Sequence, residues 1–380
     1  MERKMAIIGA GISGLLACKY ALSKGYRPIV FEAQSGIGGV WTKTIEITKL
    51  QTPKPAFQFS DFPWPDSVTE LFPDQNQVLE YLESYARHFD LLHHIRFNTK
   101  AVSIDYEGAT SEVQQAWALW GGTGEPFDFK GGKWNITIQD TKSLSTERWA
   151  SSKFVESYVK RKLNLAKFGM VPKHSFLQEL SSCLISSVPD DFYNRVEKGS
   201  IRLKKASSFG FCKEGILIDG ETEILKTDLV ILGTGFKGVE KLRDIFVSPT
   251  FQDLIVGSPV KTVPLYRECI HARIPQLAVI GFSESVANLY TSEIRCRWLT
   301  ELLDGTFKLP SIKEMEKDID KWDAYMKQYS DKNYRRSCIG ALHIWYNDQL
   351  CKDMGWNPKR KKGWFAELFE PYGPTDYASP

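Results

Sequence analysis

Six residues near the start of the chain, Gly9-Ala10-Gly11-Ile12-Ser13-Gly14, have the spacing Gly-x-Gly-x-x-Gly. In this pattern the first glycine permits a tight turn, the second lets the backbone approach a pyrophosphate, and the third lets a helix pack closely against the preceding strand. An apolar run at 4–10 precedes the motif, and a helical apolar pattern at 15–22 follows it. This order predicts a dinucleotide site with the pyrophosphate at the helix N-terminus, near Ser13.

A carboxylate follows the glycine motif at the distance that a ribose contact requires. The apolar run 28–31 predicts a second parallel strand, and Glu32 lies at its end. A carboxylate in this position accepts hydrogen bonds from both hydroxyls of an adenosine ribose, and it repels a 2′-phosphate. NADP is therefore disfavoured at this first site. The alternative, a purely structural glycine turn, accounts for the spacing but not for the strand, the helix and the acidic residue around it.

A second glycine cluster, Gly36-Ile37-Gly38-Gly39-Val40-Trp41, follows the second strand. Its glycines allow the chain to pass close to a ligand, and the Trp41 ring offers a large flat wall. The alternative is a plain turn beside a core tryptophan.

Composition excludes several classes of protein. A net charge of +3 over 380 residues argues against nucleic acid as the main partner. The seven cysteines are scattered without a Cys-x-x-Cys pair, which predicts reduced thiols and a cytoplasmic protein rather than a disulfide framework or a zinc site. The six histidines show no ligand spacing, so no metal is expected. No apolar run has the length of a membrane span.

The rest of the chain reads as alternating strands and helices. A helix is expected at 76–89, a small antiparallel arm is expected from strands at 95–98, 101–105 and 134–138, and an exposed loop is expected at 113–133. Further along we expect strands at 216–220, 227–235 and 277–281, helices at 292–303 and 312–329, and a helical cap with an aromatic interior at 334–377. The basic stretch 148–170 predicts a helix with a solvated charged face; a helix lying on an anionic membrane is the alternative.

Taken in order along the chain, several short motifs resemble those of the flavin-containing monooxygenases, and in particular a plant branch of that family. They are Gly9–Gly14, Glu32, Gly38-Gly39-Val40-Trp41, Leu50-Gln51-Thr52, Asp61-Phe62-Pro63 and Thr234-Gly235-Phe236. The resemblance implies an α/β fold: a Rossmann-like FAD-binding domain with a parallel sheet and a small antiparallel arm, a second domain, and a C-terminal helical cap.

The resemblance also implies that the first nucleotide is FAD. The glycine motif would hold its pyrophosphate, Glu32 its ribose, and Val102 its adenine through the backbone. The path to the isoalloxazine would be lined by Gly39, Val40, Trp41, Gln51 and Thr52, and a returning strand would end below the nucleotide at Gly235. In the family, NADPH reduces FAD, O₂ is captured as a C4a-hydroperoxyflavin, and one oxygen passes to a small molecule with a nucleophilic nitrogen or sulfur, or to a carbonyl. The cofactor carries this chemistry, so no catalytic side chain is predicted.

Two family features of the NADPH site are missing by our interpretation. Phe129-Lys130-Gly131 begins a Phe-x-Gly-x-x-x-His motif, but no histidine follows at the required place. By this interpretation no second glycine fingerprint follows anywhere downstream, and no outgoing strand lies between Ile138 and Arg148. We interpret this as an internal deletion near 147–148 that removed most of the NADPH-binding domain. Without that cradle, hydride delivery should be slow, because donor and acceptor are no longer held in contact.

The predicted division of the chain follows from this deletion. We expect an FAD-binding domain in two parts at 1–147 and 226–290, a remnant of the NADPH-binding domain at 148–225, and a helical region at 291–380. Exposed apolar side chains of the remnant, such as Phe154 and Tyr158, could bind a partner. Three functions stay open: a monooxygenase, an FAD-binding protein or truncated product with impaired activity, and a flavin oxidase or reductase with another electron donor.

Overall fold

The structure of the chain is a computed structural model, and it divides into two compact units. Unit 1 contains residues 1–155, 174–186 and 239–380, and unit 2 contains residues 156–173 and 187–238. The residues that the structure describes are 3–44, 48–119, 127, 131–141, 192–204, 206, 208–220, 223–227, 238–258, 261–330, 336–340 and 342–379. Within those ranges no helix combines the length and the apolar character needed to cross a membrane.

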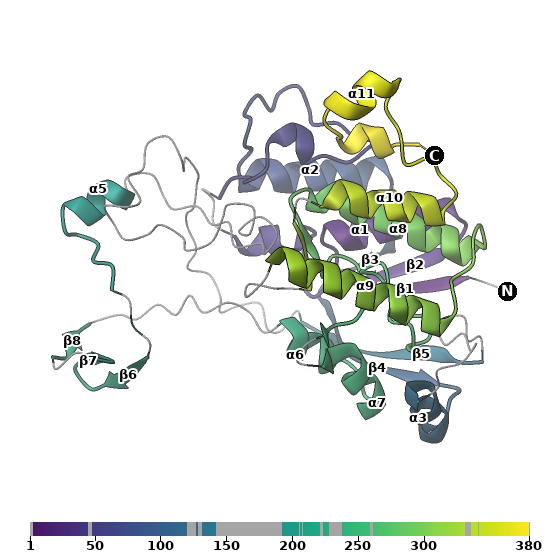
Figure 1. The fold of residues 1–380 in the computed structure, drawn as a ribbon, viewed down its shortest axis with the longest axis horizontal. Helices are drawn as coiled ribbons and strands as arrows, with labels where there is room; N and C mark the ends of the chain where they lie inside the picture. Colours follow the sequence, from purple (N-terminus) through teal and green to yellow (C-terminus); the bar gives the residue numbers. More distant parts are fainter. Residues whose placement is uncertain are drawn as a thin grey trace. The chain divides into compact units, whose positions relative to one another are not determined.

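Unit 1 begins with the predicted strand, helix and strand (Figure 1). Three parallel strands form a sheet in the order β1-β2-β3, with the bounds Lys4–Ile8, Arg27–Phe31 and Ile95–Arg96. Helix α1 (Ile12–Ser23) connects β1 to β2 and ends, as predicted, just before Gly25, which has a φ of 73°. A βαβ unit of this kind brings the glycine turn and the end of β2 to the same edge of the sheet.

The first strand is less buried than its apolar sequence predicts. Only Ile7 is buried in β1, and Ile8 is 48% exposed. Among the described residues β1 pairs with β2 alone, so it lies at an edge of the described sheet. Hydrophobic sequence alone does not show whether a strand has neighbours on both sides.

The helix predicted at 76–89 is α2 (Gln75–His88), and its start is encoded by a capping box. The Asp74 side chain accepts a hydrogen bond from Gln77 N, and the Gln77 side chain accepts one from Asp74 N. The buried face of α2 packs on α1 in one apolar core, which includes Leu15, Leu82 and Tyr85. Short 3₁₀ helices flank this region: η1 (Gly39–Lys43), η2 (Lys54–Ala56) and η3 (Leu92–His94).

Two of the three strands predicted for the antiparallel arm form it, as β4 (Thr99–Glu107) and β5 (Lys133–Asp140). The assignment of 95–98 to the arm is wrong, because β3 pairs parallel with β2 in the first sheet of unit 1. The expected exposed loop at 113–133 is wrong in its first part, because residues 111–119 form helix α3 (Ser111–Leu119). The Thr110 hydroxyl accepts a hydrogen bond from Val113 N at the helix start, and Gln114 is buried against the segment before α7. The sequence predicts this helix start only if Thr110 is recognised as an N-cap residue.

The arm shares a second apolar core with residues 246–274. This core contains Ile104 and Tyr106 from β4 together with Phe246 and Phe251. The elements in and just before this segment are α6 (Gly238–Arg243), α7 (Pro249–Val256), β9 (Gly257–Ser258) and β10 (Lys261–Thr262). The arm is therefore anchored by residues that lie more than a hundred positions away in the chain.

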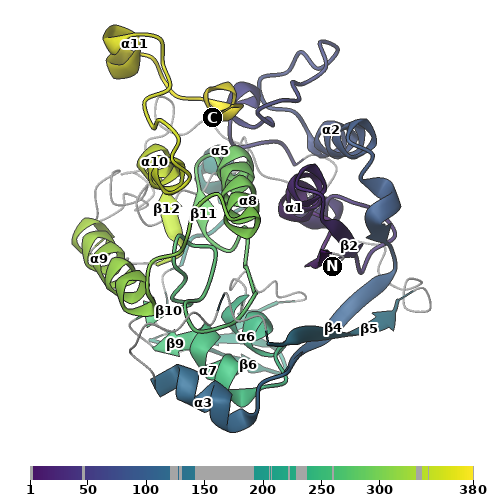
Figure 2. The same cartoon turned by 90° about the vertical axis from the view of Figure 1, so that its right-hand side faces the viewer.

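Helices dominate the last part of unit 1, as predicted. The expected helices at 292–303 and 312–329 are α8 (Asn288–Asp304) and α9 (Ile312–Ser330). Helix α8 extends beyond both predicted ends, and α9 is one residue longer at its C-terminal end. Figure 2 shows α8 between α1 and α10, and both contacts are close. The remaining elements are β11 (Glu284–Ser285), β12 (Cys338–Gly340), α10 (His343–Asp353), α11 (Trp364–Phe369) and η7 (Pro374–Tyr377).

The buried strand expected at 277–281 does not form. Ala278 makes one isolated bridge to Ile270, and residues 277–280 are only half-buried. A short apolar run forms a strand only where a neighbouring strand pairs with it, and the run itself does not show whether one is present. The segment instead crosses unit 1 in extended form and turns at Gly281, which has a φ of 84°.

Unit 2 contains helix α5 (Phe192–Glu197) and a separate antiparallel sheet in the order β6-β7-β8. Its strands span Phe209–Cys212, Gly215–Ile218 and Leu225–Lys226. Strand β7 confirms the strand expected at 216–220. The basic helix expected at 148–170 and residues 228–235 of the returning strand lie outside the described residues, and the proposed domain boundaries remain predictions.

Among the cysteines that the structure describes, all but Cys338 follow the expectation of reduced thiols. Cys338 takes part in a disulfide, whereas Cys18, Cys212, Cys269, Cys296 and Cys351 are free. The spacing of cysteines in a sequence does not show which of them meet in the fold.

Candidate functional site

The glycine motif forms the turn between β1 and α1 that the sequence predicts. Gly9 has a φ of 97°, and its N–H donates to Phe31 O on β2 at 2.8 Å. Gly11 is the N-cap residue of α1, with no side-chain cap and no acidic residue in the first turn. Because side chains do not take up the first backbone N–H groups of α1, those groups are available to an anion at Ile12 and Ser13.

Two backbone contacts explain why glycines occupy this turn. A Cβ at Gly14 would lie 1.9 Å from Gly9 O, so the helix could not approach the turn with any side chain there. A Cβ at Gly11 would lie 3.3 Å from Gly39 Cα, and Gly38 N donates to Ala10 O at 3.1 Å. The second glycine cluster thus lies directly against the first. The two motifs, separate in sequence, form one backbone-lined surface, as an extended phosphate ligand requires.

Glu32 lies where the sequence predicts it, at the end of β2 beside the glycine turn. Its side chain is buried, and one carboxylate oxygen accepts a hydrogen bond from Ala10 N at 2.6 Å. The other oxygen accepts one from Gln34 N at 2.8 Å. Each carboxylate oxygen has a second lone pair, so the group can still accept hydrogen bonds from a diol. The carboxylate therefore also holds the turn that would bind the pyrophosphate.

The residues expected along the isoalloxazine path fall on η1 and on the loop after it. Val40 is 74% exposed, whereas Trp41 is half-buried, with its ring edge-on to Phe57 at 6.0 Å. The Thr52 hydroxyl donates to Val286 O at 3.1 Å, and Gln51 is exposed beside it. Val40 and Gln51 thus offer side chains that the described residues do not cover, while Trp41 and Thr52 are fixed by their neighbours.

Val102 lies in a β-bulge of β4. Ala101 pairs with Ile138 and Ser103 pairs with Thr137, so Val102 has no partner in the register. The extra residue of a bulge is left out of the strand ladder, and its backbone groups are free for other contacts. The start of β4 is tied to Glu32, because Thr99 N donates to Glu32 O at 2.7 Å. This geometry leaves the backbone of Val102 available for a contact near the Glu32 end of β2.

Sequence reasoning did not include two residues that lie against the start of α1. A Cβ at Gly281 would come within 2.4 Å of the Ser13 hydroxyl oxygen, and the Cys296 sulfur lies 3.8 Å from Ser13 O. Gly281 ends the run 277–281, which was expected to reach the ligand edge of the sheet. The glycine at the end of this run could therefore have indicated a close approach to the site, although the run is not a strand.

A family model described as flavin-binding monooxygenase-like matches residues 2–123 and 130–365. The chain belongs to this family. The Arabidopsis thaliana protein named probable flavin-containing monooxygenase 1 is 32% identical, covering 98% of this chain and 96% of that protein. The protein named putative flavin-containing monooxygenase 2 from the same plant is also 32% identical, covering 93% and 98%.

A solved structure supports the fold. The S-allyl-L-cysteine S-oxygenase from Allium sativum matches with a TM-score of 0.55 at 16% identity, covering 94% of this chain and 89% of that one. At this identity the likeness shows the mixed α/β fold with a parallel sheet and helices. The family model and the relatives, and not this likeness, make the chain a flavin-dependent monooxygenase by descent.

The prediction that no second Gly-x-Gly-x-x-Gly follows downstream is wrong. The spacing Gly-x-Gly-x-x-Gly does recur, at Gly233-Thr234-Gly235-Phe236-Lys237-Gly238. This is the stretch whose Thr-Gly-Phe motif resembles the returning strand of the FAD site, so it does not replace an NADPH fingerprint after the antiparallel arm. Residues 233–237, and with them the predicted contact Gly235, lie outside the described residues. The interpretation of a missing NADPH fingerprint thus rests on position in the sequence and not on spacing alone.

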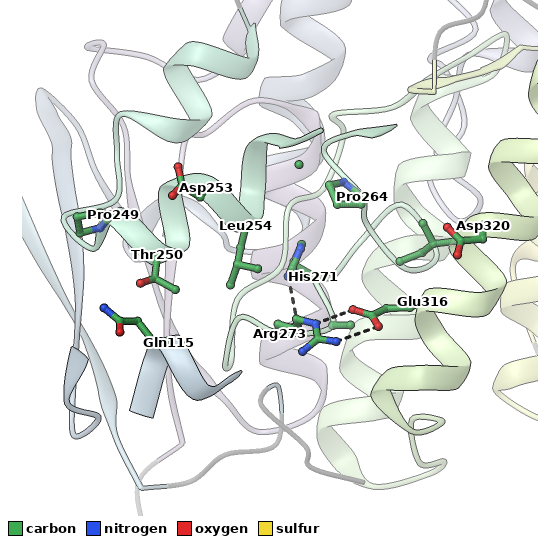
Figure 3. Close-up of a pocket in the computed structure, with 13 residues that line it drawn as sticks. Gln115, Pro249, Thr250, Asp253, Leu254, Pro264, His271, Arg273, Glu316 and Asp320 are labelled. Atoms are coloured by element: carbon green, nitrogen blue, oxygen red, sulfur yellow. Dashed lines mark hydrogen bonds and ion pairs between the residues drawn. The ribbon is translucent and has the colours of Figure 1, made fainter. Parts of the chain in front are cut away.

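A cavity of about 840 Å³ opens elsewhere in unit 1, between α3, α7 and α9 (Figure 3). Its most polar feature is a two-fold contact of Arg273 with Glu316, in which Nε and Nη2 donate to the two carboxylate oxygens at 2.6 and 3.0 Å. None of the predicted cofactor residues lines it. Because the Arg273 guanidinium is already paired with Glu316, we do not assign the cofactor to this cavity.

No metal centre accompanies the site in the part of the chain that the structure describes. No group of three or more histidine, cysteine, aspartate or glutamate side chains could hold an ion there.

Proposed function

We propose that unit 1 binds FAD at the surface formed by the two glycine clusters, and that the chain uses it for oxygenation. The observation that carries the proposal is the contact of Gly11 with Gly39 beside the buried Glu32 carboxylate. A Cβ at either glycine would press on the backbone of the other, so glycine at both positions lets the two clusters lie directly against each other. The N-terminus of α1 favours the negative pyrophosphate, and Glu32 favours the ribose diol over a phosphate.

When bound, FAD would supply redox and oxygen chemistry, giving transfer of one oxygen atom from O₂ to a soft nitrogen or sulfur nucleophile. The protein residues would position it. Gly11, Ile12 and Ser13 would bind the pyrophosphate, and Val102 would contact the adenine through its backbone. Trp41 and Thr52, fixed by Phe57 and Val286, would form a rigid wall that helps to exclude water from the reacting end.

A specific observation favours a second candidate, an FAD-binding protein with impaired use of NADPH. The alignment with the probable flavin-containing monooxygenase 1 extends over 518 positions, more than the 380 residues of this chain. Part of that relative therefore faces gaps here, which supports the loss of a segment from this chain. The position of the loss, near 147–148, is our proposal. A shortened NADPH site would lower the rate of hydride delivery and leave FAD binding intact.

An anaerobic titration separates the two candidates. The purified chain, reconstituted with FAD, would be mixed first with NADPH and then with dithionite while the flavin spectrum is recorded. Rapid bleaching by NADPH, with S-oxide formation from a thioether once O₂ is admitted, would establish the monooxygenase. Bleaching by dithionite alone would establish the impaired form. Failure of the chain to retain FAD would overturn both.

The remaining expectations concern partners and location. A small molecule with a nucleophilic nitrogen or sulfur is the proposed substrate, and O₂ is the second one. A cytoplasmic location and a protein partner at the remnant of the NADPH domain are proposals from the sequence alone.

A further inference from the structure

Helix α11 presents an exposed apolar face that the flavin site does not use. Its four large apolar side chains, Trp364, Phe365, Leu368 and Phe369, are 75%, 63%, 69% and 68% exposed. Monomeric proteins seldom expose several large apolar side chains side by side without a partner. In both ribbon views α11 lies at the periphery of unit 1, beyond α10 (Figures 1 and 2).

The segment around α11 is held in this exposed position by polar contacts. Arg360 lies over the Trp356 and Tyr377 rings, and Lys361 pairs with Asp376 at 2.9 Å. Glu367, on α11 itself, accepts hydrogen bonds from Lys361 N and from the Tyr372 hydroxyl. Because these contacts point inward, the aromatic side chains are left facing outward on a fixed support.

A basic run stands immediately before the apolar face. Residues 359–362 read Lys-Arg-Lys-Lys, and Lys359 and Lys362 are exposed. The nearby carboxylates of Glu367 and Asp376 are turned toward the protein, and Glu370 is the acidic residue of α11's own end that stays exposed. The outer surface of the segment thus combines exposed lysines with tryptophan and phenylalanine.

We propose that α11 and the lysines before it form a docking surface for an anionic lipid membrane. Tryptophan and phenylalanine favour the boundary between headgroups and acyl chains, and a short helix can lie in that plane with its apolar face buried. Lysines beside such a face are attracted to anionic headgroups. Charge complementarity selects this occupant over a second copy of the chain, because two copies meeting through this face would bring the two basic runs together.

Co-sedimentation with vesicles tests the proposal on the full chain. Binding would be compared for phosphatidylcholine vesicles with and without phosphatidylserine. We expect binding to the anionic vesicles only, reduced at least about tenfold by Trp364→Ser/Phe365→Ser. Lys359→Glu/Lys362→Glu should reduce it at least about 25-fold, since each lysine near the surface contributes about fivefold. Lys313→Glu/Lys321→Glu on α9, with the same change of charge at exposed positions, should retain most of the binding.

A second measurement locates the contact. Bromine-labelled lipid should quench tryptophan fluorescence in the unchanged chain, and Trp364→Phe should bind as well but lose most of that quenching. Equal binding to both kinds of vesicle, or equal losses in the α9 variant, would overturn the proposal. So would a dimer in solution that Trp364→Ser/Phe365→Ser converts to a monomer while vesicle binding is unaffected. Circular dichroism would show that each variant is folded.

Discussion

The Glu32 carboxylate accepts a hydrogen bond from Ala10 N at 2.6 Å, and this contact joins the two halves of the proposed ribose and pyrophosphate site. The same carboxylate also accepts a hydrogen bond from Gln34 N, so it fixes the backbone of the glycine turn to the backbone that follows β2. A residue predicted from its distance to a glycine motif is therefore also a structural support of that motif.

The first prediction concerns this carboxylate. In Glu32→Gln, the charge is lost and an amide N–H must face one of the two backbone N–H donors. We expect FAD to bind about 10–100-fold more weakly, since charge-assisted hydrogen bonds are lost. Glu32→Arg should abolish FAD retention. The binding constant would be measured by quenching of free FAD fluorescence. Glu80→Gln, an exposed change on α2, serves as the control, and an unchanged affinity in Glu32→Gln would refute the ribose assignment.

The second prediction compares two glycines with positive φ. Gly39 has a φ of 58°, and a Cβ there would lie 3.0 Å from Gly11 Cα. Gly25 has a φ of 73°, but a Cβ there meets nothing within 4 Å. Gly25→Ala should cost about 1–2 kcal/mol of stability from the left-handed backbone and leave FAD binding unchanged. Gly39→Ala should carry the same backbone cost and, in addition, displace Gly11.

The measurement for this pair is FAD affinity beside thermal unfolding. Gly39→Ala should weaken FAD binding at least about tenfold, because an error of a few tenths of an ångström moves the backbone that contacts the ligand. If the two alanine variants bind FAD equally well, the contact between the glycine clusters does not form the cradle.

Local sequence patterns predicted the glycine turn well. The sequence of Gly9 to Gly14 contains both the turn and one reason for it, since a side chain at Gly14 would collide with Gly9 O within the same βαβ unit. The close contacts of Gly11 with Gly39 and of Gly281 with Ser13 could not be predicted from spacing, because these residues meet only through the tertiary fold. Family resemblance placed Gly39 in the site but gave no physical account of it.

The wrong predictions share one cause, which is that the structure of a segment depends on the residues that pack against it. Strand β1 is half exposed, and 277–281 is not a strand, because apolar sequence does not specify pairing. Helix α3 lies in a segment predicted to be a loop, because glycines follow it closely in the sequence and its start depends on the Thr110 cap. These errors lie in the surroundings of the site and leave the glycine turn itself unaffected.

The third prediction concerns the buried carboxylate of Glu293 on α8. It accepts hydrogen bonds from Ser60 N, from the Ser60 hydroxyl and from the Tyr20 hydroxyl, at 2.9, 2.7 and 2.6 Å, and it pairs with Arg297 one helical turn later. Ser60 precedes the Asp61-Phe62-Pro63 motif, so Glu293 ties that loop to α1 and α8. Glu293→Ala should lower the free energy of unfolding by about 3–5 kcal/mol, since it leaves a buried guanidinium without its carboxylate.

A matched pair on the surface provides the control for Glu293. Glu83 and Arg87 on α2 have the same spacing of four residues, but their side chains are 55% and 70% exposed. Glu83→Ala should cost less than about 0.5 kcal/mol. Urea unfolding would compare the two variants, and equal small losses would show that the Glu293 cluster does not stabilise the fold.

The last prediction concerns pH and the buried imidazole of His271, at the cavity of Figure 3. Burial, and then the neighbouring Arg273 charge, lower the pKa of His271 from 6.5 to about 3, and its Nδ1 accepts a hydrogen bond from Arg273 N at 3.1 Å. Below pH 6.5 the unfolded chain therefore binds a proton that the folded chain does not. Stability should fall by about 1.4 kcal/mol per pH unit as the pH drops from 6.5 toward 3. Between pH 7 and pH 5 this histidine alone should cost about 2 kcal/mol.

His271→Gln removes this titration and should flatten the pH dependence by that amount, although it is less stable at pH 7 because one buried contact is altered. The free energy of unfolding would be measured in urea at both pH values. His93→Gln, at a histidine whose side chain is 81% exposed, should keep the pH dependence of the unchanged chain. Other groups, such as Asp348, whose pKa is raised to about 6 by burial, titrate in all three proteins and cancel in the comparison. Parallel pH profiles for the unchanged chain and His271→Gln would show that His271 is protonated in the folded state and that the cavity is wetter than its burial indicates.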